Sequence, residues 1–381
     1  MRGRPMSLVF IGSAEDGFVD AGRSYDVGGL SKIRFGRALD GSRICFEGET
    51  GGARVGIPHP WVSGEHCQVE LDLETTTSGM ALRDLQSRNG TLLENKPVLG
   101  TAGLRLEEVF EVGRTFWMLR SGDPESDGLS DPGADQSAYA PLFSTLRSTL
   151  VGVAASQVPV LVLGETGTGK EHLARAIHQH SGRTGAFVPM RLGAYADDEL
   201  AAALVGSRRS SVPSFVDRAD KGTLFLTDIG GISAKTQTRL RSLLSRIMEG
   251  RGRRRRDIRL VSASVADLRT LVEQRKFRPE LYSRLAGVEL ALPPLRQRRD
   301  RIGALIRSFA ASRTSGPMTL STRAFRHALA HQWPFNVREL HHALGAALSV
   351  SSDHGRVNLA VFEEVLREAQ GPATPGSNYS S

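Results

Sequence analysis

The chain has 381 residues, of which 40% are hydrophobic and 24% charged, and its formal net charge is +8. This is the composition of a globular protein with two or three domains, and no apolar run approaches the roughly 20 residues that a membrane helix needs. The apolar run near the N-terminus is also too short for a signal peptide. Because Cys45 and Cys67 are the only cysteines, the sequence predicts no disulfide framework, a reducing cytoplasmic location and no membrane partner.

Much of the positive charge lies in two arginine clusters, at 251–256 and 296–301. Such clusters contact nucleic acid or an acidic partner in some proteins and are solvated loops in others. No aromatic residue interleaves with the arginines of 251–256, which favours a solvated loop over direct DNA binding.

Residues 6 to about 120 alternate apolar and polar positions in short runs separated by glycine-bearing turns, which predicts an all-β sandwich. Three polar groups stand out within it: FGR at 35–37, VSGEH at 62–66 and LQSRNGT at 85–91. A guanidinium can form a charge-assisted fork with phosphate, a hydroxyl can add a directional hydrogen bond, and an Asn amide can pair with an extended peptide. Asn89-Gly90 also fits a plain hairpin turn.

These three groups, in this order, resemble the forkhead-associated (FHA) domain, which binds phosphothreonine peptides. By this resemblance Arg37 and Ser63 would hold the phosphate, His66 would brace the loop from inside, and Arg88 with Asn89 would grip the peptide backbone. The implied partner is a threonine-phosphorylated protein. The interval between Arg37 and Ser63 departs from the family pattern, because it carries the strand-like RICFEG and the glycine-rich GETGGARVG.

Residues 121–138 are rich in Ser, Gly, Pro and Asp, which predicts a flexible acidic linker. After Tyr139, apolar runs alternate with helical sequence, which predicts a parallel sheet covered on both faces. The strand-like runs are 160–163, 186–192, 222–228, 258–264 and 288–293. From residue 301 the strand signal is lost, and helical patterns run through 324–329 and 359–366.

The sequence VPVLVLGETGTGKEHLARAIH, at 158–178, predicts a strand, a phosphate-binding loop and a helix. The glycines let backbone amides converge on phosphate oxygens at a helix N-terminus, and Lys170 can reach the terminal phosphates. The residues expected to bind ATP or ADP are Gly164, Glu165, Thr166, Gly167, Thr168, Gly169, Lys170 and Glu171. Glu171 stands where the general pattern has Ser or Thr, which leaves Mg²⁺ binding open, and no other metal site is expected.

Several segments resemble the central ATPase domain of bacterial enhancer-binding proteins, the AAA+ activators of sigma-54 RNA polymerase. They are GETGTGKEHLARAIH, LVG at 204–206, KGTLFLTDIG at 221–230, RKFRPELYSRLAGVELALPPLRQRRDRI at 275–302 and WPFNVRELHHAL at 333–344. The resemblance implies an α/β P-loop domain followed by a helical lid.

The resemblance also implies roles for three arginines. Arg278 and Arg284 match arginines that the family inserts into a neighbouring subunit's nucleotide site, and Arg338 matches the lid arginine that touches the same nucleotide. The family's acidic Asp-Glu pair is replaced here by Thr227 and Asp228. Because phosphoryl transfer relies on metal charge and a positioned water, we expect slow or no hydrolysis, with Asp228 a weak catalytic remnant or simply a cap of the next turn.

Other parts of the family pattern are changed. Ser264 and Val265 stand where the family has Thr-Asn as a phosphate sensor. The segment between Gly206 and Gly222 lacks the Gly-Ala-Phe-Thr-Gly-Ala loop that contacts sigma-54. Too few residues follow 333–340 for the helix-turn-helix with which activators usually bind DNA, so none is expected.

The sequence thus predicts a multi-domain chain with an all-β FHA sandwich followed by an α/β AAA+ domain. The expected parts are FHA 1–120, linker 121–138, AAA+ α/β domain 139–305, AAA+ lid 306–370 and disordered tail 371–381. The preferred function is a signalling or transcription-regulatory protein that reads phosphorylated partners and binds nucleotide without efficient turnover. It would act on an AAA+ activator or assemble with its own copies. The alternatives are a weak but active ATPase with phosphopeptide-controlled assembly, and a nucleic-acid binder using the arginines of 251–256.

Overall fold

The computed structural model describes residues 5–38, 43–71, 79–122, 147–197, 199–206, 212–248, 256–313, 318–350 and 356–370. Most of the predicted linker, the arginines of 251–255 and the predicted tail at 371–381 therefore lie outside the described residues. The chain forms two compact units. The first comprises Met1–Leu142, Arg298–Gln332 and Leu340–Ser381, and the second comprises Phe143–Gln297 and Trp333–Glu339.

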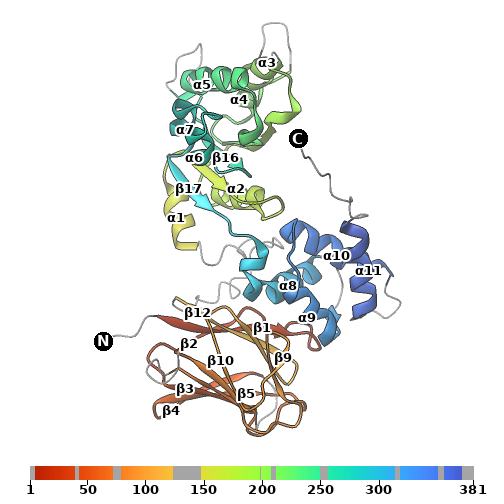
Figure 1. Cartoon of the computed structure of the whole chain (residues 1–381). Helices are drawn as coiled ribbons and strands as arrows, with labels where there is room; N and C mark the ends of the chain where they lie inside the picture. Colours follow the sequence, from red (N-terminus) through yellow and green to blue (C-terminus); the bar gives the residue numbers. More distant parts are fainter. Residues whose placement is uncertain are drawn as a thin grey trace, which may run out of the picture. The chain divides into compact units, whose positions relative to one another are not determined.

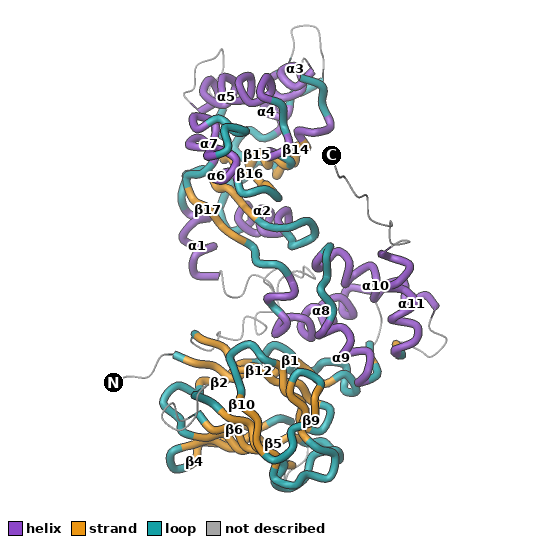
Figure 2. Tube along the Cα trace, in the orientation of Figure 1, coloured by secondary structure: helices purple, strands orange, loops and turns teal. Residues whose placement is uncertain are grey.

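The N-terminal part of the first unit is the predicted β-sandwich (Figures 1 and 2). Its sheets have the strand orders β2-β1-β12-β11-β8-β9 and β10-β7-β6-β3-β5-β4, and pairing is antiparallel except between β3 and β5. The strands are β1 Met6–Ser13, β2 Ser24–Asp26, β3 Lys32–Arg37, β4 Cys45–Glu49, β5 Gly52–Ile57, β6 Cys67–Glu70, β7 Ala81–Asp84, β8 Thr91–Leu93, β9 Lys96–Pro97, β10 Thr101–Gly103, β11 Val109–Val112 and β12 Thr115–Ser121.

Aromatic side chains fill the space between the two sheets. Phe35 of β3 meets Phe110 of β11 and Trp117 of β12 edge-on, with ring centroids 5.5 and 5.3 Å apart. All three side chains are buried. Because Phe35 immediately precedes Gly36 and Arg37, this packing fixes the strand end that carries the first predicted recognition group.

The rest of the first unit is helical (Figure 2). It contains a short 3-10 turn η6 Arg299–Arg301, α8 Ile302–Arg313, α9 Thr322–Ala330, most of α10 Asn336–Val350, α11 Leu359–Gln370 and the paired strands β18 Thr319–Leu320 and β19 Arg356–Val357. The helical patterns predicted at 324–329 and 359–366 lie within α9 and α11. No helix in the described ranges combines the length and hydropathy required to span a bilayer.

The second unit contains the predicted parallel sheet, in the order β14-β15-β16-β13-β17. All six residues of β16 are buried, as a strand covered on both faces requires. The elements are α1 Arg147–Ala155, β13 Val160–Leu163, α2 Lys170–Gln179, β14 Phe187–Arg191, η3 Leu192–Ala194, α3 Glu199–Val205, α4 Phe215–Arg218, β15 Thr223–Thr227, η4 Ile229–Gly231, α5 Ala234–Met248, β16 Arg259–Ser264, α6 Leu268–Glu273, α7 Pro279–Leu285, β17 Val288–Ala291 and η5 Leu295–Gln297.

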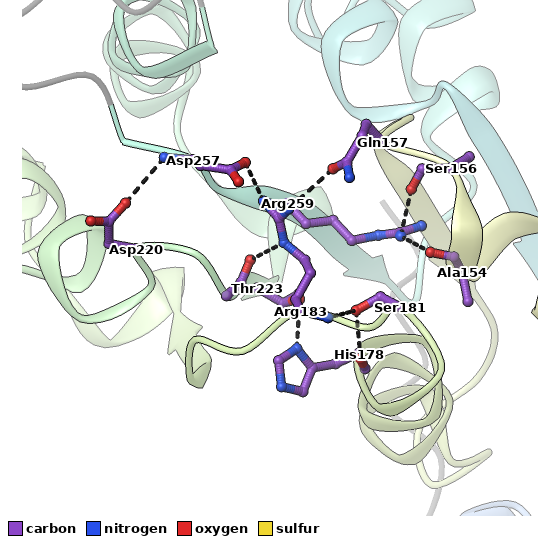
Figure 3. A network of polar contacts seen from close by, with 11 residues as sticks. Ala154, Ser156, Gln157, His178, Ser181, Arg183, Asp220, Thr223, Asp257 and Arg259 are labelled. Atoms are coloured by element: carbon purple, nitrogen blue, oxygen red, sulfur yellow. Dashed lines mark hydrogen bonds and ion pairs between the residues drawn. The ribbon is translucent and has the colours of Figure 1, made fainter.

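A buried arginine joins α1 to the sheet (Figure 3). The Arg259 side chain, 1% exposed, donates to the carbonyl oxygens of Ala154 (2.5 Å), Ser156 (2.6 Å) and Val153 (2.5 Å). These carbonyls lie at the C-terminal end of α1, where helix carbonyls lack intrahelical partners. Burial lowers the pKa of Arg259 from its usual value. The Arg259 guanidinium therefore satisfies three carbonyl groups at the end of α1.

Neighbouring polar contacts fix α2, the helix that follows the phosphate-binding loop (Figure 3). In its last turn, His178 Nδ1 lies 2.9 Å from the Thr223 hydroxyl at the start of β15. Arg183, just beyond the helix, donates from Nε to the Gly222 carbonyl at 2.8 Å and forms an ion pair with Asp257. The C-terminal end of α2 is thus tied to two strands of the sheet. These contacts fix the position of the helix and of the phosphate-binding loop at its N-terminus.

Candidate functional site

The loop between β13 and α2 requires glycine at two positions. Gly169, at the N-terminus of α2, has φ 95°, and Gly167 has φ 81°, a region that side chains disfavour. A Cβ at Gly167 would also lie 2.0 Å from the Phe335 carbonyl oxygen. The loop thus ends at the N-terminus of a helix, where free amides and the helix dipole favour an anion such as phosphate.

Lys170 points back into this loop. Its Nζ donates to the carbonyl oxygens of Gly164 at 2.7 Å and Glu165 at 2.8 Å, and the buried Thr168 hydroxyl donates to the same Glu165 carbonyl at 2.8 Å. Burial, followed by the positive charge of Arg338, lowers the pKa of Lys170 to about 8. A half-buried ammonium whose hydrogen bonds go to carbonyl oxygens is well placed to donate to phosphate oxygens.

The Glu165 side chain binds outside the loop. Arg296 donates to both of its oxygens, at 2.8 and 2.6 Å, and Asn336 Nδ2 donates to it at 3.1 Å. These two contacts, Arg296 first, lower the pKa of Glu165 to about 2. Asn336 is fully buried and also donates to the Thr166 carbonyl at 3.0 Å. The segment around Asn336 is therefore hydrogen-bonded directly to the phosphate-binding loop.

Asp228, the predicted catalytic remnant, is held in an ion pair. It follows β15 with φ 61°, and its Oδ2 accepts from Arg191 Nε at 2.5 Å. Arg191 is the last residue of β14 and lies opposite Thr227 in the sheet. Asp228 is close enough to Lys170 to counteract part of the fall in its pKa. Its side chain does not cap the following turn, so the capping alternative is wrong.

The side chains at the other altered positions, Glu171, Ser264 and Val265, are not arranged to bind a metal ion. The Glu171 carboxylate pairs with Arg175 one helical turn on, at 2.7 Å. The buried Ser264 hydroxyl donates to the Ala266 carbonyl at 2.6 Å, and Val265 is exposed. With Thr227 at the strand end, these residues do not fit Mg²⁺ in the family's manner. Among the described residues, no cluster of three or more His, Cys, Asp or Glu side chains could hold a metal ion.

The predicted arginines lie in two places. Arg338 is brought to the loop: its Cβ lies 3.1 Å from the position of a Cβ on Gly167, and its charge acts on Lys170. Arg278 is exposed at the N-terminus of α7, where its amide donates to the Gln237 side chain at 2.9 Å. Arg284 lies half-buried in the last turn of α7.

The described part of the altered segment between Gly206 and Gly222 is a short capped helix. In α4, Ser214 accepts from the Asp217 amide and the Asp217 side chain accepts from the Ser214 amide, a capping box. Arg256, the last of the predicted arginine run, pairs with Asp217 and with Asp220. Arg256 thus forms ion pairs within its own domain. Residues 207–211 lie outside the described ranges.

A second candidate site lies on the sandwich, at the loop of residues 58–66 that joins β5 to β6. Arg37, exposed at the end of β3, donates from Nε to the Val62 carbonyl and from Nη2 to the Pro60 carbonyl, both at 2.9 Å. The Arg37 amide donates to the Ser63 carbonyl at 2.9 Å. Part of the guanidinium braces this 58–66 loop, and its remaining N–H groups are available to an anion.

The other predicted residues meet at the same loop. Arg88 donates its amide to the Ser63 hydroxyl at 3.1 Å, and Asn89 Nδ2 donates to the Trp61 carbonyl at 2.7 Å. His66 is fully buried: Nδ1 accepts from the Ser63 amide at 3.1 Å and Nε2 lies 3.2 Å from the Gly90 carbonyl. Burial lowers the pKa of His66, so a neutral ring joins the two loops.

Arg54 was not predicted from the sequence. It lies on β5, within the segment GETGGARVG, and its Nη2 donates to the Gly64 carbonyl at 3.2 Å. It is also 3.0 Å from the position of a Cβ on Gly36. The guanidiniums of Arg37 and Arg54 therefore both contact the 58–66 loop. The parallel pairing of β3 with β5 reveals this, because strand β4 lies between the two residues in the sequence.

Three family models match the chain. The FHA domain matches residues 33–113, the sigma-54 interaction domain residues 138–291, and the AAA+ ATPase lid domain residues 296–378.

Similar proteins include transcriptional regulators. The C4-dicarboxylate transport transcriptional regulatory protein DctD of Pseudomonas aeruginosa is 38% identical over 230 residues, which is 55% of this chain and 50% of DctD. The sigma-54-dependent transcriptional activator SfnR of Pseudomonas putida is 35% identical over 229 residues, 56% of this chain and 63% of SfnR. The chain spans about half the length of curated relatives such as DctD.

Among solved structures, NtrX of Brucella abortus in complex with ATP matches with a TM-score of 0.53 and 25% identity, covering 61% of this chain and 57% of NtrX. The ADP complex of NtrX matches with the same TM-score and 26% identity.

Proposed function

We infer from its FHA domain, sigma-54 interaction domain and AAA+ lid domain that this chain is an FHA-fused relative of the sigma-54-dependent activators, and we propose that it is a signalling regulator of transcription. In this proposal the FHA domain reads threonine-phosphorylated partners and the AAA+ domain binds ATP or ADP with slow or no turnover. The observation that carries it is a phosphate-binding loop with Lys170 inside it, beside a strand end where Thr227 offers no carboxylate.

Nucleotide binding rests on the loop from Gly164 to Glu171. Lys170 is half-buried, points into the loop and is near Arg338, so two cations converge where phosphates would lie. The similar protein NtrX was crystallised with ATP and with ADP, which supports the same ligand class here.

Slow turnover rests on the groups that would organise metal and water. Thr227 offers no carboxylate, Asp228 is engaged by Arg191, and Glu171 is engaged by Arg175. Phosphoryl transfer depends on electrostatic stabilisation by metal and on a positioned nucleophile, so these changes together should cost orders of magnitude in rate.

Phosphopeptide reading rests on the two loops that Ser63 and His66 join. Arg37, Ser63 and Arg88 supply a guanidinium, a hydroxyl and a second cation at one edge of the sandwich, and Asn89 stands beside them. A doubly charged phosphate bound by such a set gains charge-assisted hydrogen bonds that unphosphorylated threonine cannot make.

Regulation would then proceed through another AAA+ protein or through copies of this chain. Arg278 and Arg284 on α7 are the groups we propose to act on a neighbouring subunit's nucleotide. The segment 207–221 lacks the family's sigma-54 contact sequence, so the proposed action on transcription is indirect. The second candidate function is a weak but active ATPase with phosphopeptide-controlled assembly, which the retained arginines favour.

Calorimetry on the full chain tests both binding functions. ATP and ADP should bind with and without Mg²⁺, and Lys170→Ala should abolish this binding. A peptide mixture with one fixed phosphothreonine and random flanks should bind, its unphosphorylated counterpart should not, and Arg37→Ala should weaken the binding. Undetectable nucleotide binding would remove the nucleotide function, and equal peptide binding by Arg37→Ala would remove the FHA function.

A further inference from the structure

Along β1 and β12, the outer face of the sandwich is buried as completely as its core. Along β1 and β12, Leu8, Phe10, Trp117 and Leu119 point into the core between the sheets. The alternate residues Val9, Ile11, Phe116 and Met118 point the other way and are only 0–3% exposed. In an antiparallel sheet with one free face these positions would contact water. Something of this same chain must cover them.

The helices of the lid are what covers them. Phe325 of α9 lies edge-on to Phe116 and to Phe18, with centroids 4.9 and 4.8 Å apart. At Gly303 of α8 a Cβ would lie 1.9 Å from the Ile11 carbonyl oxygen, so the helix backbone rests directly on β1. Aromatic packing and a glycine contact of this closeness are features of a domain core rather than of a loose linker contact.

Ion pairs surround this apolar contact. Arg326 of α9 forms a fork with both oxygens of Glu111 on β11, at 2.6 and 2.7 Å, and Glu111 is 6% exposed. Arg299 forms a second fork with Glu94, at 2.8 and 2.9 Å. A buried carboxylate needs its partner, so separating the FHA domain from the lid would leave Glu111 uncompensated.

The same hairpin that meets the lid also holds the proposed peptide-binding loop. Arg114, in the turn between β11 and β12, stacks on the Trp61 ring of the 58–66 loop, with its guanidinium carbon 3.6 Å from the ring centroid. Its Nη1 pairs with Glu15 at 2.6 Å, and the Thr322 hydroxyl at the start of α9 donates to the same Glu15 oxygen at 3.2 Å. A Cβ at Gly113 would lie 2.4 Å from a Val62 methyl. One chain of contacts thus runs from the loop to α9.

The lid is in turn continuous with the nucleotide-binding unit. Helix α10 is one segment, Asn336–Val350, whose first turn belongs to the second unit and whose residues from Leu340 belong to the first. That first turn carries Asn336 and Arg338, and the Val337 amide donates to the Gly167 carbonyl at 3.1 Å. Helix α10 therefore joins the lid covalently to the segment that contacts the phosphate-binding loop.

From these contacts we infer that the FHA domain is built onto the AAA+ lid as one folded body, and that occupancy of the 58–66 loop is transmitted through Trp61, Arg114 and Glu15 to the lid helix α9. This inference rests on the proposed phosphopeptide binding.

Hydrogen exchange on the full chain tests the connection without any ligand. Arg326→Ala should speed exchange in the 58–66 loop by about tenfold, because it leaves Glu111 unpaired beneath the hairpin that supports the loop. Arg323→Ala, an exposed arginine on the same helix, is the matched control and should leave the loop unchanged. Faster exchange in α9 with an unchanged loop would overturn the inference. Thr322→Val, which removes a single hydroxyl, gives a milder test should Arg326→Ala fold poorly.

A second measurement uses the phosphothreonine peptide mixture. In the wild-type chain it should slow exchange both in the 58–66 loop and in α9, by about threefold or more, and in Glu15→Ala it should slow exchange in the loop alone. Protection of the loop with no change in wild-type α9 would overturn the transmission and leave phosphopeptide binding standing. Absence of protection at the loop would rule out phosphopeptide binding itself, and with it the transmission of phosphopeptide binding to α9.

Discussion

The ionisation of Lys170 should control nucleotide affinity. Burial first, then the charge of Arg338, lowers its pKa to about 8 in the free protein. Bound phosphates would stabilise the ammonium and raise that pKa, so binding is favoured while Lys170 is protonated. The contribution of Lys170 to nucleotide affinity is therefore present below about pH 8 and is lost as the pH rises above that value.

The size of the effect follows from the same pKa. A group with a pKa of about 8 is about nine-tenths protonated at about pH 7 and about one-tenth protonated at about pH 9. Nucleotide affinity should therefore fall about tenfold over this interval, which corresponds to about 1.4 kcal/mol. The effect is large enough for calorimetry to resolve.

The assay is calorimetry of ADP binding at constant ionic strength across this pH interval, with Lys170→Arg as the matched control. The guanidinium remains charged throughout, so the variant should bind with an affinity that hardly changes with pH, whatever its strength. Equal wild-type affinity at both pH values would refute the role given to Lys170. An identical slope in Lys170→Arg would assign the proton to the nucleotide or to another group.

Three further changes have expected outcomes. Arg37→Ala should weaken binding of the phosphothreonine mixture about tenfold or more by calorimetry, through lost charge-assisted hydrogen bonds, and the exposed Arg105→Ala should not; equal losses would mean that only overall charge matters. Thr227→Asp combined with Asp228→Glu should raise ATP turnover about 100-fold in a phosphate-release assay, because it restores both carboxylates; unchanged turnover would locate the defect elsewhere. Arg259→Met should destabilise the second unit by about 3–5 kcal/mol in denaturant unfolding, because three helix-end carbonyls lose a buried donor; a loss under about 1 kcal/mol would show that water replaces the arginine.

Local patterns in the sequence were sufficient to predict the fold. The strands of the parallel sheet follow from continuous apolar runs, and the loop before α2 follows from glycine spacing and Lys170, because each signal depends on neighbouring residues. The FHA sandwich and the AAA+ domain with its lid are confirmed by the matching family models and by the sheet topology.

Contacts between residues far apart in the chain could not be predicted from the sequence. Asp228 was predicted as a remnant, but its partner Arg191 lies 37 residues earlier and meets it only because β14 and β15 are adjacent. Glu165 and Arg296 are separated by 131 residues. Such pairs depend on strand order and on the approach of the 333–339 segment to the loop, which no local pattern specifies.

The contact between the FHA domain and the lid has one signal in the sequence. The sequence FWMLR in β12 has consecutive apolar residues where a strand with one solvated face would alternate. This run indicates burial on both faces, but it cannot say what covers the second face. Here the cover is α8 and α9, about 200 residues further along the chain.

The proposed function requires that the AAA+ domain bind nucleotide without efficient turnover, and a hydrolysis assay tests this requirement. ATP hydrolysis by the purified full chain is followed with saturating nucleotide and Mg²⁺, beside an intact sigma-54 activator under the same conditions. We expect saturable binding of ATP, with turnover at least about 100-fold slower than that of the activator. Turnover at the activator's rate, abolished by Lys170→Ala, would contradict it.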